Sequence, residues 1–216
     1  MFITFEGPEG SGKSTAIEAA AKWLYAEGWK VVVTREPGGS RLGQALRCTL
    51  LELKNQDMND LTELFLYLAD RAQHVSEVLT PALTGYKTIV LCDRYIDSTV
   101  AYQGYGRGLD IGILERLNSL AASGLKPELT LLFDLPVEIG LERARRRNTL
   151  SQNKEGRFEA EELAFHQRVR AGFLKLASAE PERFVIIQAD LKPEVVFERV
   201  KQTIATRLPV KMNAIK

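Results

Sequence analysis

Residues 7–14 combine glycines, a lysine and a serine at a spacing that suits phosphate binding, reading Gly-Pro-Glu-Gly-Ser-Gly-Lys-Ser. Gly7, Gly10 and Gly12 can adopt backbone angles closed to other residues, so the loop can curl with its N–H groups turned inward around phosphate oxygens. Lys13 can reach the outer phosphates, and Ser14 can offer its hydroxyl to Mg²⁺. The predicted nucleotide-binding residues are Gly7, Pro8, Glu9, Gly10, Ser11, Gly12, Lys13, Ser14 and Thr15.

The residues on either side of this loop support a phosphate-binding P-loop. Residues 2–5 alternate apolar and β-branched side chains and predict a strand, and residues 16–24 predict a helix that stops near Gly28. Strand, loop and helix in this order are the context that the motif requires. The alternative is a glycine-rich turn with an incidental lysine, which leaves the flanking pattern unexplained.

Apolar, β-rich runs recur along the chain and are separated by longer segments with helical periodicity. This alternation predicts an α/β fold with a parallel sheet covered by helices on both faces. Because crossovers are right-handed, the carboxyl ends of the strands meet at one edge, where ligands bind in such sheets. The five predicted strands are residues 2–5, 31–34, 88–92, 129–133 and 184–187.

The residues that follow each strand are therefore candidates for the site. Arg35 opens the sequence Arg-Glu-Pro-Gly-Gly after the second strand, Asp93 and Arg94 follow the third, and Asp134 follows the fourth. A carboxylate such as Asp93, beside the P-loop strand, is where P-loop enzymes hold Mg²⁺. Arg94 could clamp a phosphate through paired hydrogen bonds. The alternative for these two residues is a local ion pair that ends the strand.

Composition and charge are those of an ordinary globular protein. The 216 residues are 45% hydrophobic and 26% charged, with a net charge of +1, so no general attraction to nucleic acid or to a membrane is expected. The two cysteines, Cys48 and Cys92, have no metal-ligand spacing, and Cys92 is predicted to be a buried thiol. With no signal peptide or membrane-length apolar run in the sequence, we expect a reducing, cytoplasmic setting.

Four motifs together resemble the thymidylate kinase family, in the bacterial type that has basic residues in its lid. They are FEGPEGSGKST at 5–15, TREPGG at 34–39, DRYIDSTVAYQGYGRG at 93–108 and the arginine-rich stretch at 142–157. The resemblance covers nearly the whole chain. It implies a five-stranded fold like that of P-loop nucleoside monophosphate kinases, in one domain of residues 1–216. It also implies transfer of the γ-phosphoryl group of ATP, as co-substrate with Mg²⁺, to dTMP.

The resemblance also implies roles for residues near the phosphates and the sugar. Lys13 matches the lysine on the ATP phosphates, and Ser14 and Asp93 match the residues at Mg²⁺, with Asp93 acting through water. Glu9 matches an acidic residue near the 3′-hydroxyl of the acceptor. Arg35 and Arg94 match arginines on the phosphate of the acceptor.

Base recognition maps by resemblance onto the helix predicted around residues 62–75. Tyr67 stands where the family usually has a stacking phenylalanine, and Arg71, one turn later on the same face, matches the arginine on the thymine carbonyl. Without the resemblance this pair could equally be a core aromatic beside a surface arginine. The other residues matched to the acceptor pocket are Arg47, Ser98, Tyr102 and Gln103.

The arginine-rich stretch at about 143–157 resembles a lid. The P-loop contains no arginine, so the positive charge at the transferring phosphoryl group has to come from elsewhere, and Arg143, Arg147 and Arg157 are the candidates. The alternative is a solvated basic helix end, because arginines suit a helix C-terminus. The resemblance further implies a homodimer formed through helices beside the acceptor site, including residues 61–75.

Three other functions have to be weighed against this assignment. A deoxynucleoside kinase would need a base for its neutral hydroxyl acceptor and would lack two arginines aimed at an acceptor phosphate. A nucleotide-dependent switch of the GTPase type would have Asn-Lys-x-Asp after a strand, whereas the nearest match, at 153–156, reads Asn-Lys-Glu-Gly in a polar segment. A binding module without catalysis would consume no ATP with any monophosphate.

Overall fold

The computed structural model describes residues 1–151 and 156–208 and has a five-stranded sheet at its centre. The strand order is β2-β3-β1-β4-β5, and every neighbouring pair is parallel. All five strands lie where the apolar runs predict them, so the predicted fold class is confirmed. The strands are β1 (Phe2–Glu6), β2 (Lys30–Arg35), β3 (Thr88–Asp93), β4 (Leu129–Asp134) and β5 (Phe184–Gln188).

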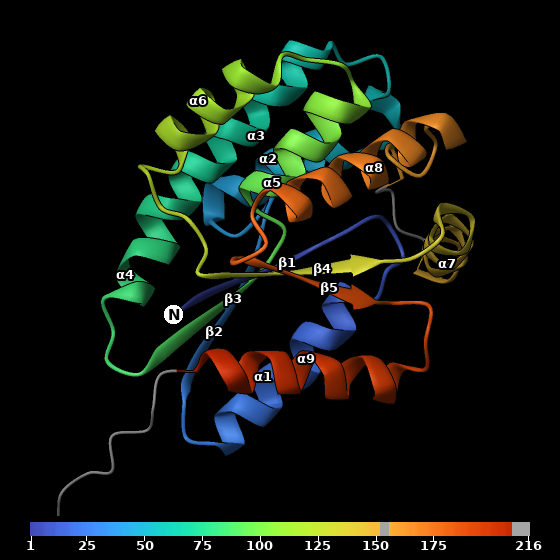
Figure 1. The fold of residues 1–216 in the computed structure, drawn as a ribbon. Helices are drawn as coiled ribbons and strands as arrows, with labels where there is room; N and C mark the ends of the chain where they lie inside the picture. The colour runs from blue at the N-terminus through green and yellow to red at the C-terminus, as the bar shows by residue number, and fades with distance from the viewer. Residues whose placement is uncertain (152–155, 209–216) are drawn as a thin grey trace, which may run out of the picture.

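Helices cover both faces of the sheet (Figure 1). One layer holds α1 (Lys13–Ala26) and α9 (Pro193–Arg207), and the opposite layer holds most of the others. Helix α7 (Val137–Ser151) lies beside the carboxyl ends of β4 and β5. The remaining elements are α2 (Arg41–Leu51), η1 (Leu53–Asn55), α3 (Asp60–His74), η2 (Val75–Leu79), α4 (Thr80–Leu83), α5 (Ile96–Thr99), η3 (Val100–Gly106), α6 (Ile111–Ala121) and α8 (Leu163–Ala179).

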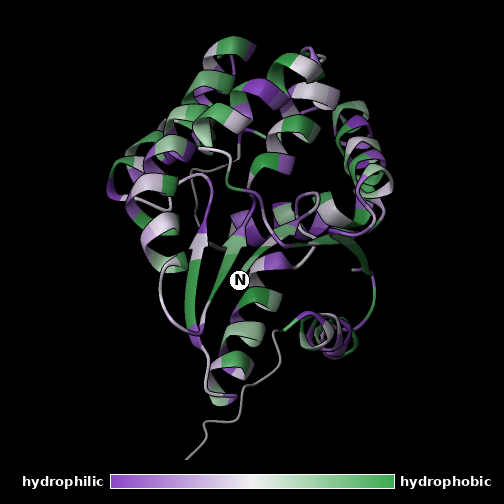
Figure 2. Ribbon diagram, turned by 60° about the vertical axis from the view of Figure 1, so that its left-hand side comes forward, coloured by the Kyte–Doolittle hydropathy of each residue, from purple (hydrophilic) through white to green (hydrophobic). Residues whose placement is uncertain are grey.

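The central strands form the core between the two helical layers. Residues of β1, including Ile3 and Phe5, and of β4, including Leu131, are fully buried. The edge strands β2 and β5 have partly exposed side chains. Figure 2 shows the hydrophobic colour running along the strands. Burying one such large side chain stabilises the fold by about 1.5–3 kcal/mol, which anchors the strand ends that hold the site.

The helix boundaries differ from the predictions mainly near the site. Helix α1 begins at Lys13, immediately after the P-loop, and ends at Ala26, with Gly28 in the left-handed region at a φ of 83°. Helix α7 continues past the arginines to Ser151. After β3 the chain forms α5 and then η3, a π-helical segment that periodicity did not predict. Such segments are frequent at functional sites.

Three features outside the site complete the comparison with the sequence. Cys92 is buried as predicted, and Cys48 is exposed. Residues 152–155 of the predicted lid, which include most of the segment compared with the GTPase motif, and the tail at 209–216 lie outside the described residues. Within the described residues, the helices are too short or too polar to cross a membrane.

Candidate active site

The P-loop connects β1 to α1 and follows the predicted curled path. Gly7, Gly10 and Gly12 have φ angles of 137°, 67° and 88°, a region that other residues rarely adopt. Close packing adds a second requirement at two of these positions. A Cβ atom on Gly7 would lie 2.3 Å from the carbonyl oxygen of Phe133, and one on Gly10 would lie 2.0 Å from that of Gly140 on α7. The loop therefore packs directly against the helix that has the lid arginines.

Lys13 is held beneath this loop. Its Nζ donates to the carbonyl oxygens of Gly7 and Pro8, at 3.0 and 2.9 Å, and to Oγ of Ser11, at 3.1 Å. Burial, reinforced by the positive charge of Arg94, lowers the pKa of Lys13 to about 8. Because no side chain among the described residues caps α1 at Gly12, the N–H groups of its first turn are available to an anion.

Ser14 and Asp93 lie side by side at the start of α1 and the end of β3. Oγ of Ser14 donates to Oδ2 of Asp93 at 2.8 Å. Mg²⁺ binds hydroxyl and carboxylate oxygens, usually through one or two protein ligands together with water and substrate phosphates. The described residues contain no cluster of three or more His, Cys, Asp or Glu side chains that could hold a metal alone. Ser14 and Asp93 thus fit an ion shared with a nucleotide. The neighbouring Thr15 is exposed.

Arg94 occupies the centre of the site, directly after β3. Its φ of 69° lies in the left-handed region, which is unusual for a residue with a side chain and is often found at functional sites. The guanidinium donates to the carbonyl oxygen of Gly7 at 2.9 Å, to Oγ of Ser98 at 3.2 Å and to Oε1 of Glu9 at 3.1 Å. It also stacks on the ring of Tyr102 at 4.9 Å. The guanidinium of Arg94 thereby links the end of β3 to the P-loop.

Glu9 faces this cation from the P-loop. Its Oε1 also accepts from the hydroxyl of Tyr102 at 2.6 Å, and its Oε2 lies 3.5 Å from Nδ1 of His166. Burial by itself would raise the pKa of Glu9, but Arg94, His166 and Tyr102 lower it to about 2. Glu9 is therefore ionised at neutral pH and offers acceptor oxygens at the cavity wall.

The predicted base-recognition residues gather at the other end, under α3 and η3. Arg71 is buried, and its Nε donates to Glu36 at 2.8 Å while Nη2 donates to the carbonyl oxygen of Tyr95 at 3.1 Å. Its Nη1 donates to Thr99 and to Asn118. A guanidinium has five N–H groups, and four of those of Arg71 have partners among the described residues, which leaves one for a ligand.

The neighbours of Arg71 define the rest of this end. Tyr67 lies 6.5 Å from Phe158 between ring centroids, tilted by 50°, and lines the cavity. Gln103 donates to Glu63 at 2.7 Å, and Ser98 donates to the buried Glu6 at 2.6 Å.

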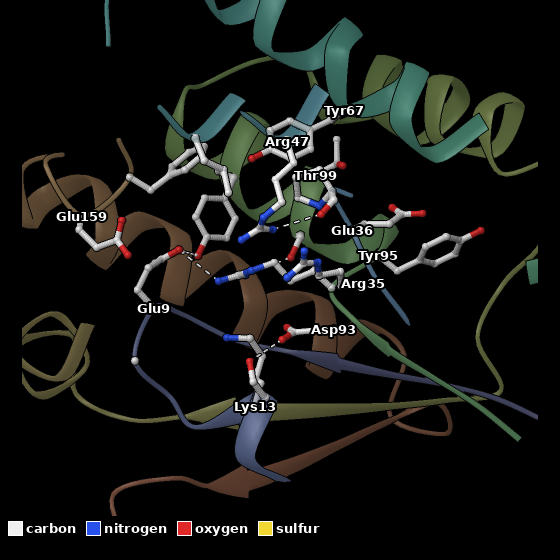
Figure 3. A pocket seen from close by; sticks show the side chains of 18 of the residues that line it. Glu9, Lys13, Arg35, Glu36, Arg47, Tyr67, Asp93, Tyr95, Thr99 and Glu159 are labelled. Atoms are coloured by element: carbon white, nitrogen blue, oxygen red, sulfur yellow. Dashed lines mark hydrogen bonds and ion pairs between the residues drawn. The ribbon is translucent and has the colours of Figure 1, made fainter. Parts of the chain in front are cut away.

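One cavity of about 360 Å³ joins the two ends. In Figure 3, Lys13 and Asp93 lie at one end and Tyr67 and Arg47 at the other, with Arg35 and Glu9 between them. Arg35 is exposed on the wall, and Arg47 donates to the carbonyl oxygen of Pro37 at 3.1 Å. The predicted residues on the wall are Glu9, Gly10, Lys13, Ser14, Arg35, Arg47, Tyr67, Arg71, Asp93, Arg94, Ser98, Tyr102, Gln103 and Arg147.

The three lid candidates have different surroundings. Arg147 lines the cavity with its side chain 61% exposed, 3.3 Å from Glu159. Arg143 is exposed and donates to the carbonyl oxygen of Ala189 at 3.0 Å. Arg157 is only 2% exposed.

The surroundings of Arg157 make it a structural residue in this conformation. Its Nε donates to the carbonyl oxygen of Leu50 at 2.6 Å, its Nη2 pairs with Glu63, and its guanidinium stacks on Phe158 at 4.7 Å. In this conformation Glu63 and Leu50 hold the guanidinium of Arg157, which supports a structural part for this residue. Its part as a lid charge stays a prediction.

The structure adds residues that motif reading missed. Glu36 holds both Arg71 and Nδ1 of His74, each at 2.8 Å, and lies inside TREPGG, where it could have been singled out. Glu63 lies one turn before Tyr67 on α3, a spacing that hints at a shared face. Asn118 and His166 have no local signal, because their partners are distant in sequence.

Three comparisons with known proteins complete the description of the site. The family model described as thymidylate kinase matches residues 5–200. A thymidylate kinase of Oleidesulfovibrio alaskensis is 58% identical over 207 residues, which cover 95% of this chain and 97% of the relative. One of Trichlorobacter lovleyi is 51% identical, covering 97% and 99%. The crystal structure of thymidylate kinase from Ehrlichia chaffeensis superposes with a TM-score of 0.74 at 35% identity, covering 94% and 98%.

Proposed function

Because the chain belongs to the thymidylate kinase family, we propose that the cavity between the P-loop and α3 is where ATP and dTMP meet. The chain transfers the γ-phosphoryl group of ATP to dTMP, giving dTDP for dTTP synthesis. The observation that supports this location is one cavity whose wall includes Lys13, Arg94 and Arg71. Figure 3 shows Lys13 at one end of this cavity and Tyr67 at the other.

Lys13 and the first turn of α1 bind the phosphates of ATP. Nζ of Lys13 exchanges its hydrogen bonds with the loop carbonyls for hydrogen bonds with phosphate oxygens, which are charged and form stronger hydrogen bonds. Ser14 and Asp93 would hold Mg²⁺, which would supply positive charge against the phosphates of the nucleotide. The P-loop glycines let the backbone N–H groups approach the same oxygens.

Arg94 and Arg35 bind the phosphate of dTMP and bring it in line with the γ-phosphorus. An acceptor phosphate is already ionised at neutral pH, so this transfer needs positioning and charge neutralisation and no dedicated general base. Glu9 accepts a hydrogen bond from the 3′-hydroxyl of the sugar. Two arginines on the wall favour a monophosphate acceptor over a nucleoside and so argue against a deoxynucleoside kinase.

At the far end, Tyr67 stacks on thymine and Arg71 donates its remaining N–H to the O4 carbonyl oxygen, while Gln103 contacts the polar edge of the base. Arg47, Ser98 and Tyr102 complete the wall. Arg147 approaches the transferring phosphoryl group from α7, and Arg143 supports it from the same helix. Lid closure then excludes water and limits hydrolysis of ATP.

The enzyme acts as a homodimer in the cytoplasm, where ATP is its co-substrate. Exposed apolar side chains occur on α2, α3 and α6, which pack together on one layer (Figure 1). Leu61 and Phe65, 51% and 56% exposed, are four residues apart and share one face of α3. Unpartnered apolar surface of this kind marks a protein interface. The others are Leu42, Ile113 and Leu120.

The test of the site is Lys13→Ala against Lys22→Ala, which removes an exposed lysine from the same helix. We expect Lys13→Ala to lower kcat on the order of 10²–10³-fold, as for the loss of one transition-state donor, with circular dichroism unchanged. Lys22→Ala should keep normal turnover. Near-normal turnover by Lys13→Ala would refute the P-loop assignment.

A further inference from the structure

A buried carboxylate at the base end of the cavity has no part in the proposed reaction. Glu63, on α3, is fully buried. Its Oε1 accepts from Nε2 of Gln103 at 2.7 Å and from Nε of Arg107 at 3.3 Å. Its Oε2 accepts from Nη2 of Arg107 at 3.0 Å and from Nη2 of Arg157. The two arginines therefore converge on Oε2, whereas Gln103 contacts only Oε1.

Glu63 is ionised in this environment. Burial opposes its charge, but Arg107 and Arg157 lower the pKa of Glu63 below its ordinary value. An ionised carboxylate accepts hydrogen bonds and cannot donate them. The amide nitrogen of Gln103 must therefore face Glu63, since the opposite orientation would set the amide oxygen against a negative charge.

The amide oxygen of Gln103 is consequently left for the cavity. The side chain lines the cavity wall, and its Oε1 has no hydrogen-bond partner among the residues that the structure describes. Gln103 is only 1% exposed, so the amide has no room to turn into bulk water. The base end thus presents a fixed acceptor, Oε1 of Gln103, near the donor that Arg71 offers.

We propose that Glu63 is a positioning residue for base selection, which fixes the amide of Gln103 so that its Oε1 accepts the N3–H of thymine. This rests on the proposed placement of thymine beside Gln103. Thymine has a donor at N3 and an acceptor at O4, whereas cytosine has an acceptor at N3 and a donor amino group at C4. An acceptor from Gln103 and a donor from Arg71 therefore match thymine and oppose cytosine at both positions.

The substitution Glu63→Gln makes this reasoning testable, because it reverses the orientation of Gln103. The oxygen of the new amide should take the position of Oε2, because an amide nitrogen there would oppose Nη2 of both Arg107 and Arg157. At the position of Oε1 the nitrogen opposes only one fixed donor, Nε of Arg107, at the longer distance of 3.3 Å. The nitrogen of the new amide then faces Gln103 and needs a hydrogen-bond acceptor. The amide of Gln103 therefore turns, so that its oxygen faces the new amide and its nitrogen faces the base. That nitrogen matches N3 of cytosine and opposes N3–H of thymine.

The experiment compares kcat/KM for dTMP and dCMP across four variants. Glu63→Gln should lower the dTMP to dCMP ratio by at least about tenfold, the size of one inverted hydrogen bond. Glu63→Asp keeps a carboxylate that can only accept, and should retain most of the ratio. Arg107→Gln should lower the melting temperature while leaving the ratio unchanged, which separates a structural effect from orientation of the amide. Gln103→Leu removes the amide that is proposed to contact the base and should lower the dTMP to dCMP ratio.

The outcomes distinguish this proposal from the one on which it rests. An unchanged ratio in Gln103→Leu would refute the placement of thymine beside Gln103. A lowered ratio in Gln103→Leu with an unchanged ratio in folded Glu63→Gln would overturn the role of Glu63 alone. If Glu63→Gln does not fold, Gln103→Leu still tests which atom of the Gln103 amide faces the base. If the nitrogen faced the base, removal of the amide would raise the dTMP to dCMP ratio of kcat/KM. If Oε1 faces the base, as proposed, its removal lowers this ratio.

Discussion

Replacing Arg157 with alanine should lower the melting temperature, whereas replacing Arg147 should lower kcat, although both residues belong to the predicted lid. Arg157 is buried between Glu63 and the carbonyl oxygen of Leu50. Breaking a buried ion pair costs about 3–5 kcal/mol, and the lower figure applies because Glu63 keeps Arg107. For a chain of this size each kcal/mol shifts the melting temperature by about 2–4 °C. Arg157→Ala should therefore melt about 6–12 °C lower.

Arg147 is expected to behave as a catalytic charge. Its side chain is 61% exposed and pairs with Glu159 at 3.3 Å. A surface pair of this kind is worth about 0–1 kcal/mol, so the melting temperature should hardly move. An arginine that stabilises the transferring phosphoryl group is worth about 10³–10⁵ in kcat in other P-loop enzymes, and we expect a loss on the order of 10³.

The assay pairs differential scanning fluorimetry with initial rates of ADP release at saturating ATP and dTMP, measured well below the melting temperature of each variant. Arg146→Ala, an exposed arginine on the same helix, controls for loss of charge. The reasoning is refuted if Arg157→Ala loses kcat at an unchanged melting temperature, or if Arg147→Ala keeps the turnover of Arg146→Ala.

Three further predictions concern other parts of the site. Because burial and Arg94 lower the pKa of Lys13 to about 8, the ammonium is lost as the pH rises through 8, and kcat/KM for ATP should fall there; Lys13→Arg should abolish this step in a pH–rate profile. Arg71→Ala should raise KM for dTMP about tenfold or more and leave KM for ATP unchanged; an unchanged KM for dTMP contradicts its role. Phe65→Asp should convert a dimer into monomers in analytical ultracentrifugation, and an unaltered sedimentation coefficient would exclude this face.

The sequence was sufficient for the sheet and for the residues at its carboxyl edge because both depend on local patterns. Strands buried on two faces have continuous apolar runs, and the P-loop requires glycines at positions such as Gly7 and Gly10, where the backbone has positive φ and meets another backbone. The side chains that follow β1, β2 and β3 then reach one cavity, because parallel strands end at one edge.

The sequence was insufficient where a role depends on a distant partner. Arg157 reads as one more lid arginine until Glu63, on a helix much earlier in the chain, is found to bind it. The pattern also gives no sign that Arg94 is in the left-handed region, or that the chain after α5 widens into the π-helical η3. These features depend on tertiary packing, which overrides local preference.

The central claim is that this cavity selects thymine and positions its monophosphate for attack on ATP. The most direct measurement is kcat/KM for dTMP, dUMP, dCMP and dGMP with ATP and Mg²⁺, in a coupled assay that detects ADP. We expect dTMP to be turned over, and dCMP to be at least about 10²-fold poorer because its N3 and its amino group oppose Gln103 and Arg71. We expect dGMP to be as poor as dCMP because its two-ring base is larger than the pyrimidine for which the cavity is proposed. Turnover of dCMP or dGMP at the rate of dTMP would contradict the account.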